Sequence, residues 1–160
     1  MLIVALIILV FLLITAWASY TGAPWVPARR HDFQAILDDA VVKKNDRLIE
    51  LGCGDGRLLL AASQRGAHVV GYEINPLLWL IAWLRCRRQP GISVHFGNFW
   101  QINLKPYDVV ITFLVPRTMS RLGRKAAGEM KKGSRLVSYI FELKDKKPFK
   151  RGRSWFIYKY

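Results

Sequence analysis

Short apolar runs alternate with helix-like segments over residues 47–141, and this alternation constrains the fold more than any other feature of the chain. The runs "RLIEL" (47–51) and "HVVGYE" (68–73) are rich in apolar residues, as are strands that are buried on both faces of a sheet. Strands that alternate with helices predict an α/β fold with a doubly wound, mostly parallel sheet. Ligands of such sheets bind beyond the carboxyl ends of the strands.

Turn residues and apolar periodicity predict the other elements. Asn75-Pro76 indicates a helix start, with Asn as the cap and Pro at the first helical position. We expect one helix over 29–44, a second from the glycines at 52–56 to about 65, and two more over 76–89 and 117–132. Further strands are expected over 92–96, 107–114, 135–141 and 154–160. The first helix is predicted to bury one apolar face made of Phe33, Ile36, Leu37, Ala40 and Val41.

The first 28 residues contain no charged side chain, and residues 2–19 are almost all apolar. About 20 such residues span a bilayer as a helix. We therefore expect a transmembrane anchor over 1–20, a linker arm over 21–28 and one domain over 29–160. The alternative is a cleaved signal peptide, because Ala16-Trp17-Ala18 resembles a cleavage site, although the usual basic n-region is missing.

Charge places the predicted domain relative to the membrane. Arg29 and Arg30 follow the span and no Lys or Arg precedes it, so the positive-inside rule predicts a single-pass membrane protein with its C-terminal domain on the cytoplasmic side. The net charge of +14 fits either nucleic acid or anionic headgroups. The oligomeric state does not follow from the sequence.

Cysteine and histidine provide no metal or disulfide pattern. Cys53 and Cys86 show neither a disulfide framework nor zinc spacing. His31, His68 and His95 are not spaced as metal ligands, so we expect no metal. Cys53 is assigned to packing beside a ligand and not to nucleophilic catalysis.

A glycine cluster, "LGCGDGR" (51–57), follows the first predicted strand. Its spacing is Gly52-x-Gly54-x-Gly56, whereas the dinucleotide fingerprint is G-x-G-x-x-G, so Arg57 stands where a glycine is required. Glu50 precedes the cluster. A carboxylate there would repel a pyrophosphate but attract the ammonium group of an amino acid.

S-adenosylmethionine carries that ammonium group and no phosphate, so the cluster favours it over NAD. Glu73 ends the second predicted strand, where its carboxylate can accept hydrogen bonds from both ribose hydroxyls. Asn98 follows the third strand, where it can bind the adenine edge. The alternative is a strand–turn–helix unit without a ligand.

The motifs "ELGCGDGR", "GYEINP", "GNFW" and "YDVVITFLVP" resemble those of class I, seven-strand S-adenosylmethionine-dependent methyltransferases. Three features together resemble a narrower group, the small membrane-anchored protein-lysine methyltransferase family. They are the apolar N-terminus, the segment "GAPWVP", and "GYEINPLL" followed by a Trp- and Arg-rich helix. Eukaryotic members of that family modify the adenine nucleotide translocase and the ATP synthase c-subunit. The resemblance thus implies a Rossmann-like methyltransferase domain over 29–160, which would be the catalytic domain and would modify lysine in a membrane protein.

The resemblance also implies roles for individual residues. Those expected around the methionine moiety are Glu50, Gly52, Cys53, Gly54 and Asp55. Ile74 would pack on the adenine, which Asn98 and Phe99 would bound on its other side, although the family usually has Asp in place of Asn98. The segment "FLVP", with Phe113, Leu114 and Pro116, matches the lining of the methyl-transfer site. No general base is identified, because Asp108 begins the fourth strand, far from its carboxyl end.

Other functions are less consistent with the sequence. The acceptor could instead be a lipid, a quinone or another small membrane molecule, or the chain could be a membrane-associated binding module that retains the fold. The Asn-Pro-Pro-Tyr form of enzymes that methylate nucleic-acid bases or glutamine is absent, which counts against nucleic acid as a partner.

Overall fold

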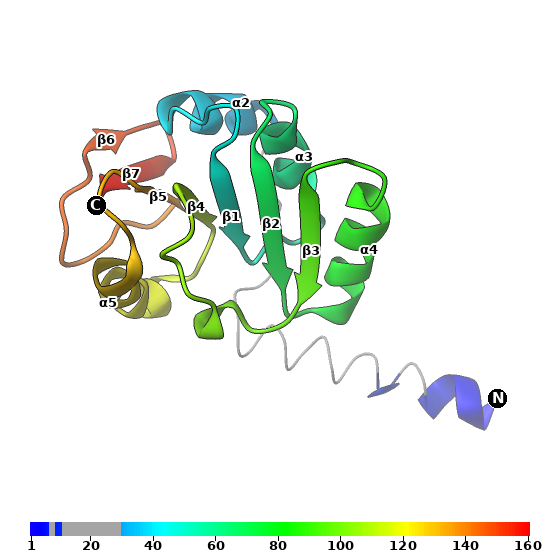
Figure 1. Cartoon of the computed structure of the whole chain (residues 1–160). Coiled ribbons are helices and arrows are strands. Elements are labelled where there is room, and N and C mark those ends of the chain that lie inside the picture. Colours follow the sequence, from blue (N-terminus) through cyan, green and yellow to red (C-terminus); the bar gives the residue numbers. More distant parts are fainter. Residues whose placement is uncertain (7–8, 11–29) are drawn as a thin grey trace.

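The computed structural model describes residues 1–6, 9–10 and 30–160 of the chain, and its core is a single sheet (Figure 1). The strand order is β3-β2-β1-β4-β5-β7-β6. The strands are β1 Arg47–Leu51, β2 His68–Glu73, β3 Ile92–Phe96, β4 Val109–Thr112, β5 Arg135–Tyr139, β6 Lys150–Arg151 and β7 Trp155–Lys159. Neighbours among β1 to β5 pair in parallel, whereas β7 is antiparallel to β5 and β6. The predicted α/β fold with a mostly parallel sheet is confirmed.

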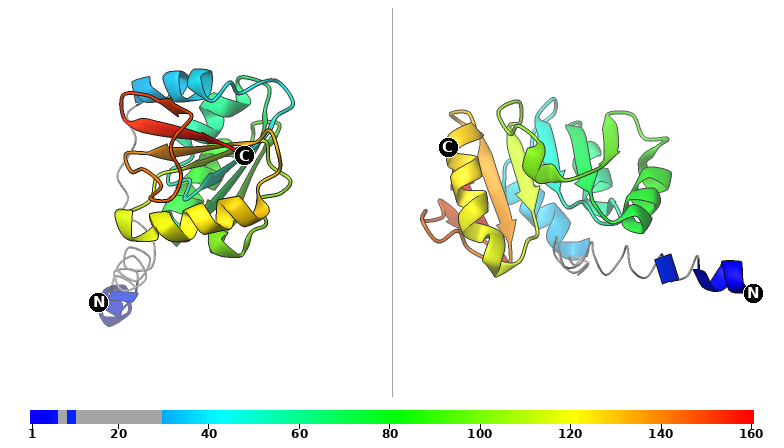
Figure 2. Two further views of the ribbon diagram at one scale, coloured as in Figure 1. Left: turned by 90° about the vertical axis from the view of Figure 1, so that its left-hand side faces the viewer. Right: turned by 90° about the horizontal axis from the view of Figure 1, so that it is seen from below.

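Helices cover both faces of this sheet. They are α2 Arg30–Asp39, α3 Arg57–Ser63, α4 Pro76–Cys86 and α5 Met119–Glu129, with the short 3₁₀ helices η1 Phe99–Gln101 and η2 Pro116–Thr118. Figure 2 shows α5 on one face and α2 and α4 on the other. The predicted cap of α4 is confirmed, because Asn75 Oδ1 accepts hydrogen bonds from the backbone N–H groups of Leu77 (3.0 Å) and Leu78 (3.3 Å).

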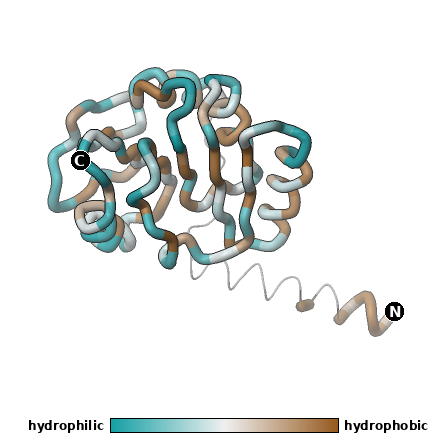
Figure 3. The backbone as a smooth tube through the Cα atoms, viewed as in Figure 1, coloured by the Kyte–Doolittle hydropathy of each residue, from teal (hydrophilic) through white to brown (hydrophobic). Residues whose placement is uncertain are grey.

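Two hydrophobic cores lie on the two faces of the sheet. Successive strand residues point to opposite faces, so Leu48 joins the core under α2, α3 and α4, while Ile49 joins the core under α5. The middle parts of the central strands accordingly carry apolar colour (Figure 3). Burial on both sides explains why the sequence of these strands does not alternate between apolar and polar residues.

Helix α2 ends five residues before the predicted position 44, and the predicted burial of Val41 is wrong. Val41 is 52% exposed and has a left-handed backbone (φ 53°), while Val42 is buried in its place. A side chain from a distant part of the sequence stabilises this exit: Arg135 Nη1 donates to the carbonyl oxygens of Ala40 (2.8 Å) and Val41 (2.6 Å). The helix therefore ends just before two carbonyl groups that accept hydrogen bonds from this long-range contact.

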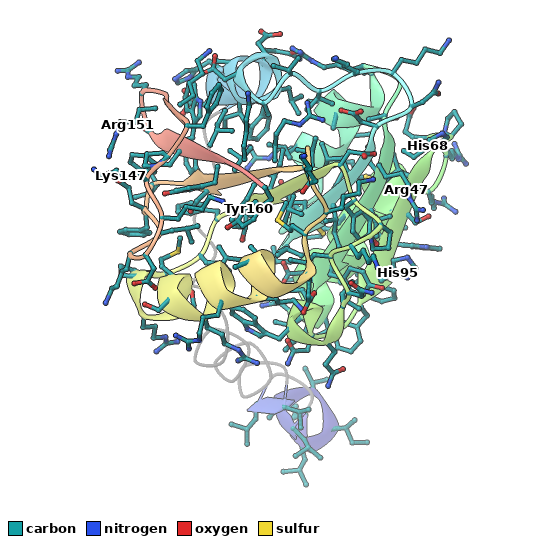
Figure 4. All side chains as sticks on the ribbon, turned by 60° about the vertical axis from the view of Figure 1, so that its left-hand side comes forward. Arg47, His68, His95, Lys147, Arg151 and Tyr160 are labelled. Atoms are coloured by element: carbon teal, nitrogen blue, oxygen red, sulfur yellow. The ribbon has the colours of Figure 1, made fainter. Side chains whose placement is uncertain are left out.

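No described segment of the chain covers the α5 side of the β2–β3 edge, contrary to the expectation for a sheet buried on both faces. Ser93 and His95 are exposed there, and the His95 ring stacks on the half-buried Tyr72 with ring centroids 5.0 Å apart. Figure 4 shows His68 and His95 at this edge, with Lys147 and Arg151 at the opposite edge near β6. The segment between β3 and β4 forms only η1 and a loop, which is too short to cover β2 and β3.

The predicted anchor (1–20) and linker arm (21–28) lie mostly outside the described residues, because positions 7–8 and 11–29 are not described. Residues 2–6 and 9–10 are helical and exposed. Within the described ranges, no helix has the length and apolar character needed to span a membrane.

Candidate functional site

The glycine cluster forms the turn between β1 and α3, and each of its three glycines has a left-handed backbone. The φ angles are 79° at Gly52, 53° at Gly54 and 78° at Gly56. Side chains with a Cβ atom adopt this conformation at a cost of about 1–2 kcal/mol per residue. The turn is held against β2, because the N–H groups of Gly52 and Cys53 both donate to the carbonyl oxygen of Tyr72 at 2.9 Å.

The outer two glycines differ in what surrounds them. A Cβ atom at Gly52 would meet no atom of the described residues within 4 Å, so these residues leave open space beside its backbone. A Cβ atom at Gly56 would lie 3.1 Å from Ala82 Cβ on α4. Gly56 therefore permits the close contact of α3 with α4, whereas Gly52 leaves room for a ligand to approach the backbone.

Glu50, the next-to-last residue of β1, is the unusual ionisable group of the site. Its side chain is partly exposed, but its Oε2 atom is buried and has no hydrogen-bond partner among the described residues. Burial, together with the negative charges of Glu73 and Asp55, raises the pKa of the Glu50 carboxyl well above its ordinary value. A ligand that brings a positive charge to this oxygen would remove the electrostatic penalty.

Glu73, at the end of β2, is buried and faces the glycine turn. Its Oε2 accepts a hydrogen bond from Gly54 N–H (2.8 Å), and its Oε1 accepts from the N–H groups of Ile74 (2.9 Å) and Asn75 (2.8 Å). A carboxylate offers about four lone-pair positions, so capacity for a further donor remains. Glu73 thus positions the turn and the start of α4, and its binding of ribose hydroxyls stays a prediction.

Asp55 has two partners that sequence reasoning did not identify. Its Oδ2 lies 2.9 Å from Arg57 Nε and 2.8 Å from Arg85 Nη1. Burial opposes ionisation of Asp55, but the hydrogen bonds and charges of Arg85 and Arg57 outweigh it and lower its pKa. Arg85 also donates to the Asp55 carbonyl oxygen. Arg85 lies thirty positions away on α4, so no local pattern in the sequence indicates this pair.

Asn98 and Phe99 follow β3. Asn98 Oδ1 caps η1 by accepting from Trp100 N–H at 3.0 Å, which leaves the exposed amide NH₂ group available for another contact. The Phe99 ring is buried in the core on the α5 side, beside Trp100 at a centroid distance of 4.9 Å. Their contacts with adenine, like that of Ile74, stay predictions.

The segment after β4 lies beside the glycine turn because β4 pairs with β1 in parallel. Thr112, the last residue of β4, donates its hydroxyl to the carbonyl oxygen of Leu51 at 3.1 Å. Phe113 is half-buried with its ring against Tyr139 (5.0 Å), Leu114 is buried, and Pro116 is exposed at the start of η2. The predicted methyl-transfer lining therefore adjoins the turn, at the carboxyl edge of the central strands.

Cys53 is buried in this turn, and its Sγ lies where a side chain at Gly71 would collide with it (2.8 Å). Burial, reinforced by the charges of Glu50 and Glu73, raises the pKa of its thiol well above the ordinary value. Cys53 therefore stays a neutral packing group. Over the described part of the chain, no group of three or more His, Cys, Asp or Glu residues is arranged to hold a metal ion.

The chain is similar to several known proteins. A family model described as the ANTKMT methyltransferase domain matches residues 50–150. The chain is 30% identical over 123 residues to the ATP synthase c-subunit lysine N-methyltransferase of Rattus norvegicus, a match that covers 74% of this chain and 56% of that protein. It is 32% identical over 130 residues to a protein-lysine N-methyltransferase of Saccharolobus islandicus, covering 78% of this chain and 81% of that protein.

The chain spans about half the length of the vertebrate relatives that it matches. Among solved structures, an RNA methyltransferase from Salinibacter ruber in complex with S-adenosyl-L-homocysteine has a TM-score of 0.79 at 24% identity. That match covers 84% of this chain and 93% of the other, and it shows a shared fold.

Proposed function

The chain belongs to the family of the ANTKMT methyltransferase domain, and on this premise we propose that it is an S-adenosylmethionine-dependent protein-lysine N-methyltransferase that is anchored in a membrane and acts on a membrane protein. The rat relative is named for lysine methylation of the ATP synthase c-subunit. The archaeal relative is named as a protein-lysine N-methyltransferase and has a length close to that of this chain.

The observation that carries the proposal is the buried Oε2 of Glu50, which has no hydrogen-bond partner among the described residues and lies two positions before the open side of Gly52. The ammonium group of S-adenosylmethionine fits this carboxylate, and the ribose hydroxyls fit the remaining acceptor capacity of Glu73. A dinucleotide would bring phosphate charge toward Glu50 and Glu73, which is repulsive. When bound, S-adenosylmethionine supplies an electrophilic methyl group on its sulfonium.

The residues of the chain then have mainly to bind and orient the reactants. Alignment of a neutral amine with the methyl group is a proximity effect. A substrate lysine must first lose a proton, and the apolar lining from Phe113 and Leu114 favours this because desolvation lowers the pKa of an ammonium group. Asp108 is not a candidate general base, because it precedes β4, at the amino ends of the parallel strands and away from the glycine turn. Its carboxylate there pairs with Lys131 Nζ at 2.6 Å.

Membrane attachment is supported by the sequence of residues 2–19 and by the exposure of apolar side chains in the described part of that segment, such as Leu2, Ile3 and Leu6. About ten residues separate position 19 from position 29, a reach of about 33–36 Å even when extended. The site would therefore lie close to the bilayer. Arg29 and Arg30 favour the cytoplasmic side for the domain.

The test is a methylation assay with the full chain reconstituted in membranes and S-adenosylmethionine labelled in its methyl group. Mass spectrometry of membranes from cells with and without the protein should show methyl-lysine near the end of a transmembrane helix only when the protein is present. A Glu73→Ala variant, which should bind S-adenosylmethionine more weakly, serves as the control with reduced activity. Label that appears only in the lipid extract would refute the lysine assignment in favour of a small-molecule acceptor, and label in nucleic acid would refute it equally.

A further inference from the structure

The outward face of α4 is apolar, although it faces away from the protein. Leu77, Leu80, Trp83 and Leu84 are each 40–50% exposed, and at about 100° per residue they form one continuous stripe along the helix. Phe96 at the end of β3 is 56% exposed and extends the stripe through its contact with the Trp79 ring, at a centroid distance of 5.7 Å. Figure 3 shows the turns of α4 in apolar colour at the outer edge of the domain.

The equivalent helix on the opposite face of the sheet behaves differently. Helix α5 buries Met119, Leu122 and Ala126, and it exposes Arg121 and Arg124. This is the usual pattern for a helix with one face in water. The exposed apolar face of α4 is therefore a specific property of that helix and not of the domain surface in general.

The charged side chains of the segment that holds α4 and β3 are all positive. No Asp or Glu occurs between Glu73 and Asp108, so α4, β3 and their connections contain no acidic residue. Arg87 and Arg88 follow the last turn of α4 and are exposed, and the Arg87 guanidinium lies over the Trp83 ring, 5.6 Å from its centroid. Arg85, by contrast, turns inward to Asp55.

These observations identify the occupant of this face. A tryptophan and a row of leucines with arginines at one end are typical of helices that lie in the interfacial region of a bilayer. A second copy of the chain fits poorly, because a two-fold contact uses the same surface of both copies, and residues 74–107 offer no acid to pair with Arg87 and Arg88. An anionic headgroup layer neutralises these arginines and accepts the apolar side chains.

We propose that the face formed by Leu77, Leu80, Trp83, Leu84 and Phe96 docks into the interfacial region of a bilayer that contains anionic lipids. Leu77 lies in the first turn of α4, directly after the segment in which Glu73 contacts Ile74 and Asn75. Docking through α4 would therefore hold the edge of the cofactor site at the membrane surface. The inference rests on the proposed membrane location of the chain, but not on the identity of the methyl acceptor.

The experiment uses the full chain in vesicles of phosphatidylcholine and phosphatidylglycerol, with an environment-sensitive fluorophore attached to a single introduced cysteine. Leu84→Cys places the label on the α4 face, and Ala127→Cys places it on the exposed side of α5 as the matched control. Native Cys53 and Cys86 are buried, and the chain without an introduced cysteine gives the background. Lipids with brominated acyl chains quench only labels that reach the apolar boundary.

We expect the label at position 84 to shift to shorter wavelength and to be quenched several times more than the label at 127. Replacing Arg87 and Arg88 with glutamine should lower the ratio of docked to undocked protein by roughly fivefold per arginine in anionic vesicles. In pure phosphatidylcholine the same pair of substitutions should have little effect.

Flotation of the vesicles separates the two proposals. Protein that floats with the vesicles while labels 84 and 127 are quenched equally would overturn docking through α4 and leave the anchor standing. Protein that does not float, with both labels unquenched, would overturn both proposals. Shielding of position 84 only in native membranes, and not in pure lipid, would assign this face to a protein partner and also overturn the inference.

Discussion

Replacement of Glu50 by glutamine should stabilise the cofactor-free chain and weaken its binding of S-adenosylmethionine. The carboxyl oxygen Oε2 is buried without a partner in the structure. Burial and the nearby charges of Glu73 and Asp55 raise the pKa of this carboxyl. The native residue is therefore unfavourable for the fold itself, as is common at binding sites that trade stability for function.

The stability effect should depend on pH in a defined direction. In the unfolded chain Glu50 ionises near its ordinary pKa of 4.5, whereas in the folded chain it keeps its proton to higher pH. The folded state then binds more protons than the unfolded state, so stability falls as pH rises above about 4.5, until the folded-state pKa is passed. Glu50→Gln removes this loss because its amide does not ionise. Its benefit should grow with pH by about 1.4 kcal/mol for each unit by which folding raises the pKa of Glu50.

Binding should change in the opposite direction. A hydrogen bond between charged groups contributes about 1.5–3 kcal/mol, so loss of the carboxylate should weaken cofactor affinity roughly tenfold to a hundredfold. Urea unfolding followed by circular dichroism at pH 5, 7 and 9 measures the first effect, and titration calorimetry measures the second. Asp145→Asn, at an exposed acid remote from the turn, is the matched control for loss of one negative charge.

Two results would refute this reasoning. If Glu50→Gln retains cofactor affinity within twofold of the wild type, the carboxylate does not hold the ammonium group. If the variant is less stable than the wild type, or equally changed at pH 5 and pH 9, Glu50 is not an uncompensated buried acid.

Four further predictions concern the same site and its attachment. Gly56→Ala should destabilise the fold more than Gly52→Ala in thermal unfolding, because the φ of 78° at Gly56 is combined with a contact to Ala82. Gly52→Ala should instead lose more cofactor affinity, as measured by calorimetry. The reverse order would contradict the assignment of the open side to Gly52. Asp55→Asn should lower the free energy of unfolding by about 1–3 kcal/mol at pH 7. This difference should disappear as pH falls below the ordinary pKa of 3.8, and a flat pH profile in urea unfolding would disprove it. Glu73→Ala leaves three backbone N–H groups without their acceptor, so it should lower stability. It should also weaken cofactor binding by about 1.5–3 kcal/mol. A change in affinity alone would show that the structural contacts of Glu73 matter little. Deletion of residues 1–21 should spare cofactor binding but sharply reduce methylation of a membrane-embedded substrate, and equal rates on soluble proteins would contradict the hypothesis of a tethered enzyme.

Local sequence determined the strands and turns that form the site. β1, β2 and β3 begin and end where the sequence predicts, because each is an apolar run bounded by Gly, Asn or Pro, which interrupt a strand within one or two residues. Asn75-Pro76 likewise starts α4, since the cap and the fixed φ of proline act over a single turn. The position of Gly52, Glu50 and Glu73 at strand ends follows from these boundaries and from parallel pairing.

Tertiary structure decided what distant residues bring to those elements. Arg135 ends α2 from almost a hundred positions away, Arg85 fixes the turn through Asp55, and the two-residue β6 exists only because β7 pairs with it. The left-handed backbone at Val41 has no local signal either, because valine normally avoids it. Such contacts depend on which surfaces meet after the chain folds, and short-range patterns of apolar and turn residues do not encode that choice.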